Sequence, residues 1–129
     1  MSRNGLPPGW RVDVQGDNRV YREVPVYSDQ ELRDLLNKGD PTVLADAAIS
    51  VSLNHEDRAF AESVLILLAN HPDPIVRGDA ILGFGHLARR FGHLGQVPKS
   101  LIEAALGDQA VFVRQQAISA ADDVRQFLD

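Results

Sequence analysis

Hydrophobic residues recur at helical spacing from Ser28 to the end of the chain. Ser28 and Glu31 form a capping box, in which each side chain can bond the other residue's backbone amide, and apolar residues follow at Leu32 and Leu35. Gly39 should end this first helix. The same pattern predicts five more: one opened by Asp40-Pro41, one capped by Asn54 and ending at Ala69, and three over 74–91, 98–107 and 110–128.

The segment before Ser28 has a different pattern. Residues 10–26, WRVDVQGDNRVYREVPV, alternate valine and tyrosine with polar residues around the turn-forming cluster Gln15 to Asn18. This predicts an N-terminal β-hairpin. An isolated hairpin is marginally stable in water, so we expect it to pack on the helices through Trp10, Val20 or Tyr21.

An internal repeat connects the predicted helices. The anchor residues Leu44, Arg77 and Arg114 lie 33 and 37 residues apart, close to the period of two-helix repeats. Each anchor follows a valine and precedes an alanine by three positions. A pair of small or leucine residues ends the first helix of each unit, and a short corner leads into the second. The repeat predicts helical hairpins that stack on one another.

Two stretches, LLANHPDPIVRGDAILGFGHLA and AALGDQAVFVRQQAISAADDV, resemble HEAT-type repeats, whose corner carries Asp or Pro before Val-Arg and a small residue. The resemblance implies a mainly α fold, with about three HEAT-like hairpins in a short α-solenoid over residues 28–128. Residues 1–27 would form the N-terminal segment of the same single domain, as a length of 129 residues favours. The first unit departs from the signature at Leu44, as terminal repeats often do.

The corner arginines have a structural explanation. Arg77 and Arg114 can each pair with an acid at a corner, such as Asp73 or Asp108, and can satisfy the corner carbonyls. We therefore expect them to fix the geometry of the repeat and do not count them as site residues.

Composition and charge narrow the possible partners. The net charge of −5 and the pI of about 5.2 disfavour nucleic-acid binding, which needs clustered Lys and Arg, and would steer a basic protein toward the chain. No apolar stretch is long enough for a signal peptide or a membrane span. The absence of cysteine fits a reducing compartment. We therefore expect a cytoplasmic protein with no nucleic-acid or membrane partner; its oligomeric state is left open.

Motifs of catalysis are missing from the sequence. There is no H-E-x-x-H, no G-x-S-x-G and no phosphate-binding glycine loop, and the four histidines have no cysteine partners. We expect no enzyme activity, no cofactor and no metal.

The second helices of the stacked hairpins should present one strip of side chains to a partner. Positions at matching offsets from the anchors align across the units and are small in the middle and acidic at the edges. Such a strip suits a protruding basic element of a protein better than a small molecule. The candidate partner-binding residues are Asp46, Asp79, His86, Gln116, Asp122 and Asp123.

Three functions compete for this surface. In size, acidity and repeat architecture the chain resembles the immunity proteins of contact-dependent or polymorphic toxin systems, which implies a bacterial protein that binds and neutralises a cognate toxin domain, here a basic one. A scaffold or regulatory protein for an endogenous enzyme would use the same surface. A third reading is a HEAT-like enzyme similar to DNA glycosylases or bilin lyases, which would need a basic channel or a bilin site.

Overall fold

Six helices make up the greater part of the described chain. The computed structural model describes the backbone of residues 10–15, 18–23 and 25–128, and the side chains of residues 25–128. The prediction of a mainly α fold is confirmed over the last range. The helices are α1 (Asp29–Lys38), α2 (Pro41–Asn54), α3 (Arg58–Leu68), α4 (Pro74–Phe91), α5 (Gln96–Ala105) and α6 (Val111–Phe127).

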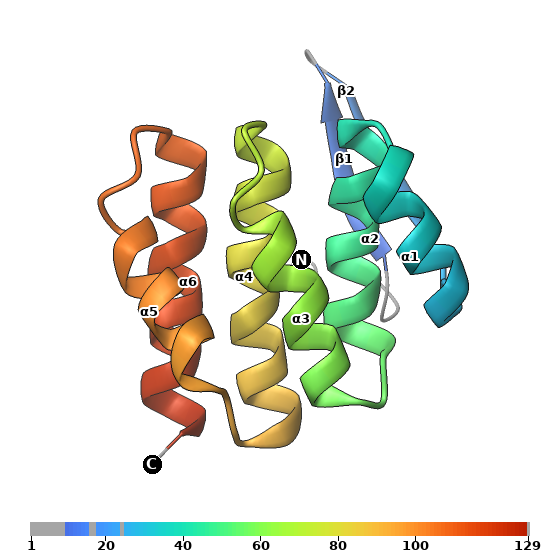
Figure 1. Cartoon of the computed structure of the whole chain (residues 1–129). Helices are drawn as coiled ribbons and strands as arrows, with labels where there is room; N and C mark the ends of the chain where they lie inside the picture. The colour runs from blue at the N-terminus through green and yellow to red at the C-terminus, as the bar shows by residue number, and fades with distance from the viewer. Residues whose placement is uncertain (1–9, 16–17, 24, 129) are drawn as a thin grey trace.

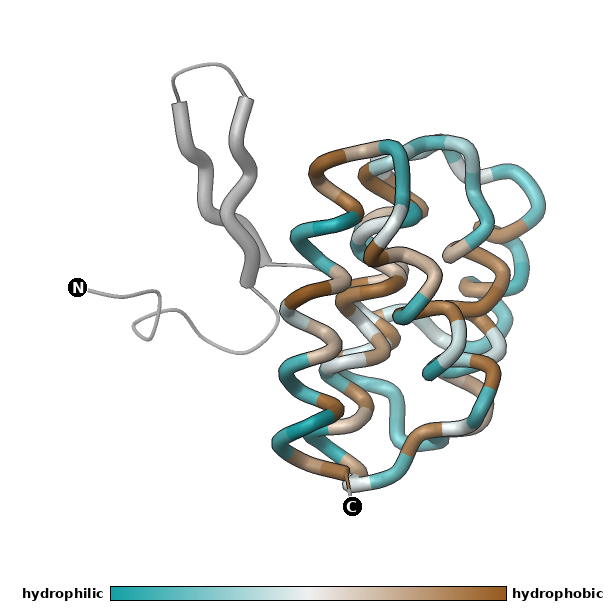
Figure 2. The backbone as a smooth tube through the Cα atoms, turned by 90° about the vertical axis from the view of Figure 1, so that its left-hand side faces the viewer, coloured by the Kyte–Doolittle hydropathy of each residue, from teal (hydrophilic) through white to brown (hydrophobic). Residues whose placement is uncertain are grey.

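The helices form three neighbouring pairs. Figure 1 shows α1 with α2, α3 with α4 and α5 with α6, so that α2, α4 and α6 make one layer and the shorter helices the other. Hydrophobic and hydrophilic segments alternate along the helices in the perpendicular view (Figure 2). The assignment of these pairs to the HEAT class, and of the whole chain to a single domain, stays a prediction.

The predicted N-terminal hairpin falls in the segment of the chain that is described by its backbone alone. Two strands, β1 (Trp10–Gln15) and β2 (Asn18–Glu23), are antiparallel in Figure 1, and the turn between them lies outside the described residues. The expected packing of Trp10, Val20 or Tyr21 on the helices also lies outside the described side chains. The hairpin as a packed cap therefore stays a prediction, and the fold described here rests on the helices.

Side-chain caps set the starts of the first four helices. The predicted capping box is present, because Ser28 Oγ accepts from the Glu31 amide at 3.1 Å and Glu31 Oε1 accepts from the Ser28 amide at 2.8 Å. Asp40 and Asp73 cap α2 and α4, each followed by a proline in the first turn.

The cap predicted for the third helix is wrong. Asn54 is the last residue of α2, and Asp57 caps α3 instead, accepting from the Phe60 amide at 3.1 Å. Asp57 takes the role because its carboxylate stands three residues before that amide, where a cap must stand. The start of α5 was also placed two residues late, since the helix begins at Gln96.

Helix α4 is the centre of the core. It packs against α2, α3, α5 and α6. Its close approach to α6 depends on Gly85, because a Cβ there would lie 2.9 Å from the Cα of Ala120 and 2.7 Å from Asp123 Oδ2. The largest side chains that are almost wholly buried are Phe84, Leu32, Leu65, Ile81, Leu87, Leu94, Val51, Val64, Val76 and Val113.

The structural role expected for the corner arginines is confirmed. Arg77 Nε and Nη2 donate to the two carboxylate oxygens of Asp108, both at 2.8 Å, and Nη1 donates to the carbonyls of His71 and Pro72. This guanidinium lowers the pKa of Asp108. The second hairpin is thus tied to the corner of the third.

Further contacts tie neighbouring pairs together. Arg90 of α4 donates to the carbonyls of Ser52 and His55 at 2.8 and 2.7 Å, which closes the carboxyl end of α2. Glu62 of α3 is buried, pairs with Arg58 and accepts from the Gly95 amide at 3.0 Å. Among the described helices, the first pair has no contact with the third.

Candidate partner-binding surface

Three residues of the predicted strip, Asp46, Asp79 and Gln116, lie largely in the interior. Asp46 on α2 and Asp79 on α4 are 6% and 2% exposed, and both have interaction partners. Gln116 of α6 is half-buried, and its Nε2 donates to Asp79 Oδ1 at 3.5 Å. The alignment of α4 with α6 at this offset is therefore present. The two carboxylates, however, have little surface to offer a partner.

The other three residues of the strip, His86, Asp122 and Asp123, are more accessible, and charges of both signs lie around them. His86 and Asp123 are half-buried at the ends of α4 and α6, and Asp122 is exposed and pairs with Arg125. Arg89 Nη2 donates to His86 Nδ1 at 2.6 Å, so this imidazole is the neutral tautomer with its proton on Nε2. The strip was expected to be acidic at its edges, but Arg89 lies among these residues.

Burial shifts the pKa values of His86 and Asp123. Desolvation, together with the charges of Arg89 and Arg90, lowers the pKa of His86 to about 4. Desolvation also raises the pKa of Asp123, although Arg89 opposes that shift. His86 is consequently uncharged at neutral pH and can offer a partner only an N–H donor and an apolar ring.

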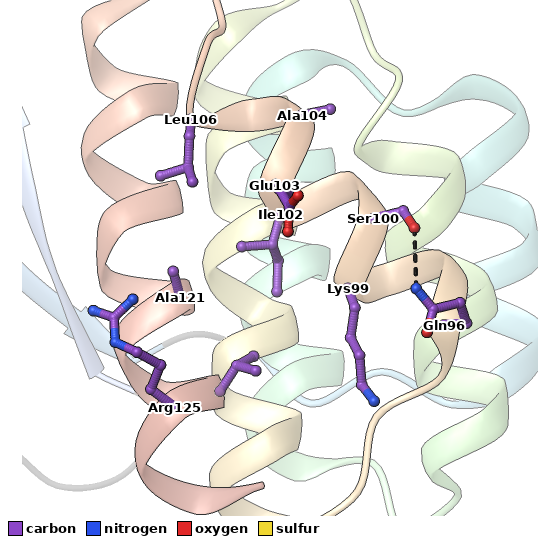
Figure 3. Close-up of a pocket in the computed structure, with 10 residues that line it drawn as sticks. Gln96, Lys99, Ser100, Ile102, Glu103, Ala104, Leu106, Ala121 and Arg125 are labelled. Carbon is purple, nitrogen blue, oxygen red and sulfur yellow. Dashed lines mark hydrogen bonds between the residues drawn. The ribbon is translucent and has the colours of Figure 1, made fainter. Parts of the chain in front are cut away.

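A groove lies between α5 and α6, and the sequence analysis did not predict it. The groove has a volume of about 740 Å³. Figure 3 shows Ile102 and Ala121 between the two helices, Leu106 at one end, and Lys99 extending toward the other. The remaining residues that line the groove are Gln96, Ser100, Glu103, Ala104, Val124 and Arg125.

Exposed apolar side chains gather on the same pair of helices. Ile118 of α6 is 55% exposed, whereas Ile81, which occupies the same repeat position in α4, is 2% exposed because the third hairpin packs on α4. The outer face of α6 thus leaves uncovered a position that is core in the preceding unit. The other large exposed apolar residues of this hairpin and its flanks are Val97, Leu106, Val111 and Phe127.

The corner of the third hairpin repeats the second with one difference. Arg114 Nη1 donates to the carbonyls of Asp108 and Gln109, as Arg77 Nη1 does to those of His71 and Pro72. Arg77 also binds a carboxylate of the following unit. Arg114 has no ion pair among the described residues.

Over residues 25–128, no three His, Asp or Glu side chains gather closely enough to hold a metal ion. None of the described helices is both long and apolar enough to cross a bilayer.

The described fold defines a class: a small protein of paired helices in two layers, with an uncovered groove at its C-terminal pair. No protein-family model and no curated protein matches the chain. It is similar, at 30% sequence identity and a TM-score of 0.74, to a chain in the crystal structure of the CDI complex from Cupriavidus taiwanensis LMG 19424. The match covers 84% of this chain and 96% of that one. The protein therefore belongs to the same family as that component of the CDI complex.

Proposed function

We propose that this protein is an immunity protein of a bacterial contact-dependent growth inhibition system, which binds and neutralises a cognate toxin domain. The observation that carries the proposal is the similarity to a chain of a CDI complex, which extends over nearly the whole of that chain. A protein of that family is expected to act by binding another protein. The proposal therefore includes a non-enzymatic role.

The charge of the chain supports a particular kind of toxin. At a net charge of −5, the protein attracts a basic domain over the range of the Debye length, which speeds their encounter. A toxin domain that acts on nucleic acid needs such a basic surface. We accordingly propose a basic toxin domain as partner, a cytoplasmic site of action and a HEAT-like stack as the scaffold of the interface.

The experiment that tests the proposal is co-expression in bacteria. The proposal predicts that a gene beside this chain encodes a large secreted protein. The probe is the C-terminal domain of that protein, expressed from an inducible promoter with or without the chain. We expect growth arrest without the chain, growth with it, and co-purification of the two proteins.

Two outcomes would count against the proposal. Growth arrest that persists despite abundant, folded chain would show that it gives no protection against that domain. A neighbouring gene that encodes no secreted protein, together with capture of a metabolic enzyme by the tagged chain, would favour the scaffold function.

A further inference from the structure

The C-terminal pair of helices exposes features that the rest of the fold keeps covered. The uncovered groove lies between α5 and α6, and Ile118 lies beside it on α6. Exposed apolar residues that lie together often mark interaction sites in soluble proteins. The apolar residues that line this groove between two helices can receive the apolar face of an amphipathic segment of another protein.

Two cations of this hairpin form no ion pair with a described residue. Lys99 is only partly exposed and points along the groove in Figure 3, and among the described residues its ammonium group has no ion pair, either with Glu103 one helical turn further along α5 or with another carboxylate. Arg114, in the first turn of α6, is partly buried. Its guanidinium donates to carbonyl oxygens, and its charge lowers the pKa of Asp108 without forming an ion pair with that carboxylate. Such cations favour a carboxylate brought by a partner.

Comparison with the preceding repeat unit indicates which partner the Arg114 guanidinium could still bind. In the preceding unit the equivalent guanidinium, Arg77, binds its corner carbonyls with one nitrogen and a carboxylate of the next unit with two others. At Arg114 the first set of bonds is made and the position of the carboxylate lies beyond the last helix. A partner's Asp or Glu at that position would reproduce the bidentate pair.

A second copy of this chain cannot stack on α6 in the way that α6 packs on α4. In α4, Gly78 and Gly85 allow α6 to approach so closely that a Cβ at either position would come within 2.5 to 2.7 Å of Phe112 or Asp123. The equivalent positions of α6 are Gln115 and Asp122, whose side chains hold a further helix away. The outer face of α6 thus lacks the glycines that let the preceding pair pack so closely, and we assign the groove to a protein other than a second copy.

We propose that the groove between α5 and α6 docks a segment of the toxin domain that presents an apolar face and at least one carboxylate, which pairs with Arg114 or Lys99. This inference rests on the proposed function and names the surface and the local chemistry of its partner. A toxin domain that is basic overall needs only one or two acidic side chains at this contact.

The test measures the affinity of the chain for the toxin domain used in the co-expression experiment, by isothermal titration calorimetry. Lys99→Glu reverses the charge at the groove, and Leu106→Gln removes an apolar contact. We expect each to raise Kd about tenfold or more, because both groups become buried in the complex. Lys38→Glu and Leu67→Gln are the matched controls, since both residues are exposed on the first two hairpins and should leave Kd within about twofold.

Arg114→Lys examines the bidentate pair separately. Lysine can still reach the corner carbonyls but cannot bind a carboxylate with two parallel N–H groups. We expect weaker binding with little change in the melting temperature. Circular dichroism of every variant shows whether the fold is kept, and Lys99→Glu and Leu106→Gln change surface positions, so the test does not depend on Arg114.

The outcomes separate the two proposals. If the wild-type chain fails to bind the toxin domain, the proposed function is overturned. If the wild-type chain binds and both groove variants bind equally well, or if the controls weaken binding as much, the groove assignment alone is overturned. A dimer of the isolated chain in sedimentation that Lys99→Glu dissociates would also overturn it.

Discussion

At the scale of single residues, Arg77 illustrates how one side chain stabilises two units. Its guanidinium contacts a carboxylate from the third hairpin and two carbonyls of its own corner, in a partly buried position. Removing it leaves several polar groups without their partner, and such groups are costly when water cannot replace the lost bonds. The exposed pair of Arg125 with Asp122 has no comparable burial.

We expect Arg77→Met to lower the free energy of unfolding by about 2 to 4 kcal/mol, because Asp108 loses its bidentate partner and the carbonyls of His71 and Pro72 lose their donor. Arg125→Met is the matched control and should change it by less than about 1 kcal/mol, since exposed ion pairs contribute little. Urea denaturation followed by circular dichroism measures both. Similar losses in the two variants would contradict the structural role of the corner.

His86 should make stability depend on pH. Its pKa is about 4 in the folded protein against 6.5 in an unperturbed chain, so between these values the unfolded chain binds a proton that the folded protein does not. Stability therefore falls as the pH falls from about 6.5 to 4, by about 3 kcal/mol in total. Denaturation at pH 7 and pH 4.5 should show a smaller difference in the free energy of unfolding for His86→Gln than for the wild-type protein.

At the scale of helices, the contact between α4 and α6 depends on an absent side chain. Gly85→Ala should destabilise the protein by about 1 to 3 kcal/mol, because the new methyl group meets the backbone of Ala120. The sign of this stability change is informative, because helix propensity alone would make Gly85→Ala stabilising. Gly107→Ala, where the nearest atom would be 3.8 Å from the Cβ, should stay within about 0.5 kcal/mol of wild type. Thermal unfolding that ranks the two variants in the opposite order would show that α6 adjusts freely.

The helices could be predicted from the sequence because their starts and stops are local. Ser28, Asp40 and Pro74 act within one turn of themselves, and the repeat fixed the pairing of α3 with α4 and α5 with α6. The error at Asn54 came from two possible caps three residues apart, which composition alone does not separate.

The candidate site could be predicted less well, because exposure depends on neighbours that the sequence does not specify. Asp79 and Gln116 stand at the same repeat position, yet the aspartate is buried and the glutamine is half-buried. The groove was missed for a related reason: Ile118 matches Ile81 in the repeat but is exposed, because none of the described helices packs on that face of α6. Comparing equivalent positions of the last two units would have pointed to it.

At the scale of the whole molecule, the acidic net charge should govern the rate of encounter with a basic toxin domain. We expect the association rate constant, measured by stopped-flow fluorescence, to fall by about tenfold or more between 50 and 500 mM NaCl, with a smaller change in the dissociation rate. The groove contributes mainly through apolar contacts, which salt does not screen. An association rate that does not change with salt would contradict a basic partner.

The absence of contact between the first and third helix pairs, over the described residues, has a practical consequence. Over the described helices, a structural change in the first pair can affect the third pair only through α3 and α4, because each pair contacts only its neighbour. A fluorescent label, a fusion or a surface tether on α1 should leave the opposite end free to engage. The first hairpin is thus a suitable site for attaching the protein to a surface or a label while the third hairpin binds its partner.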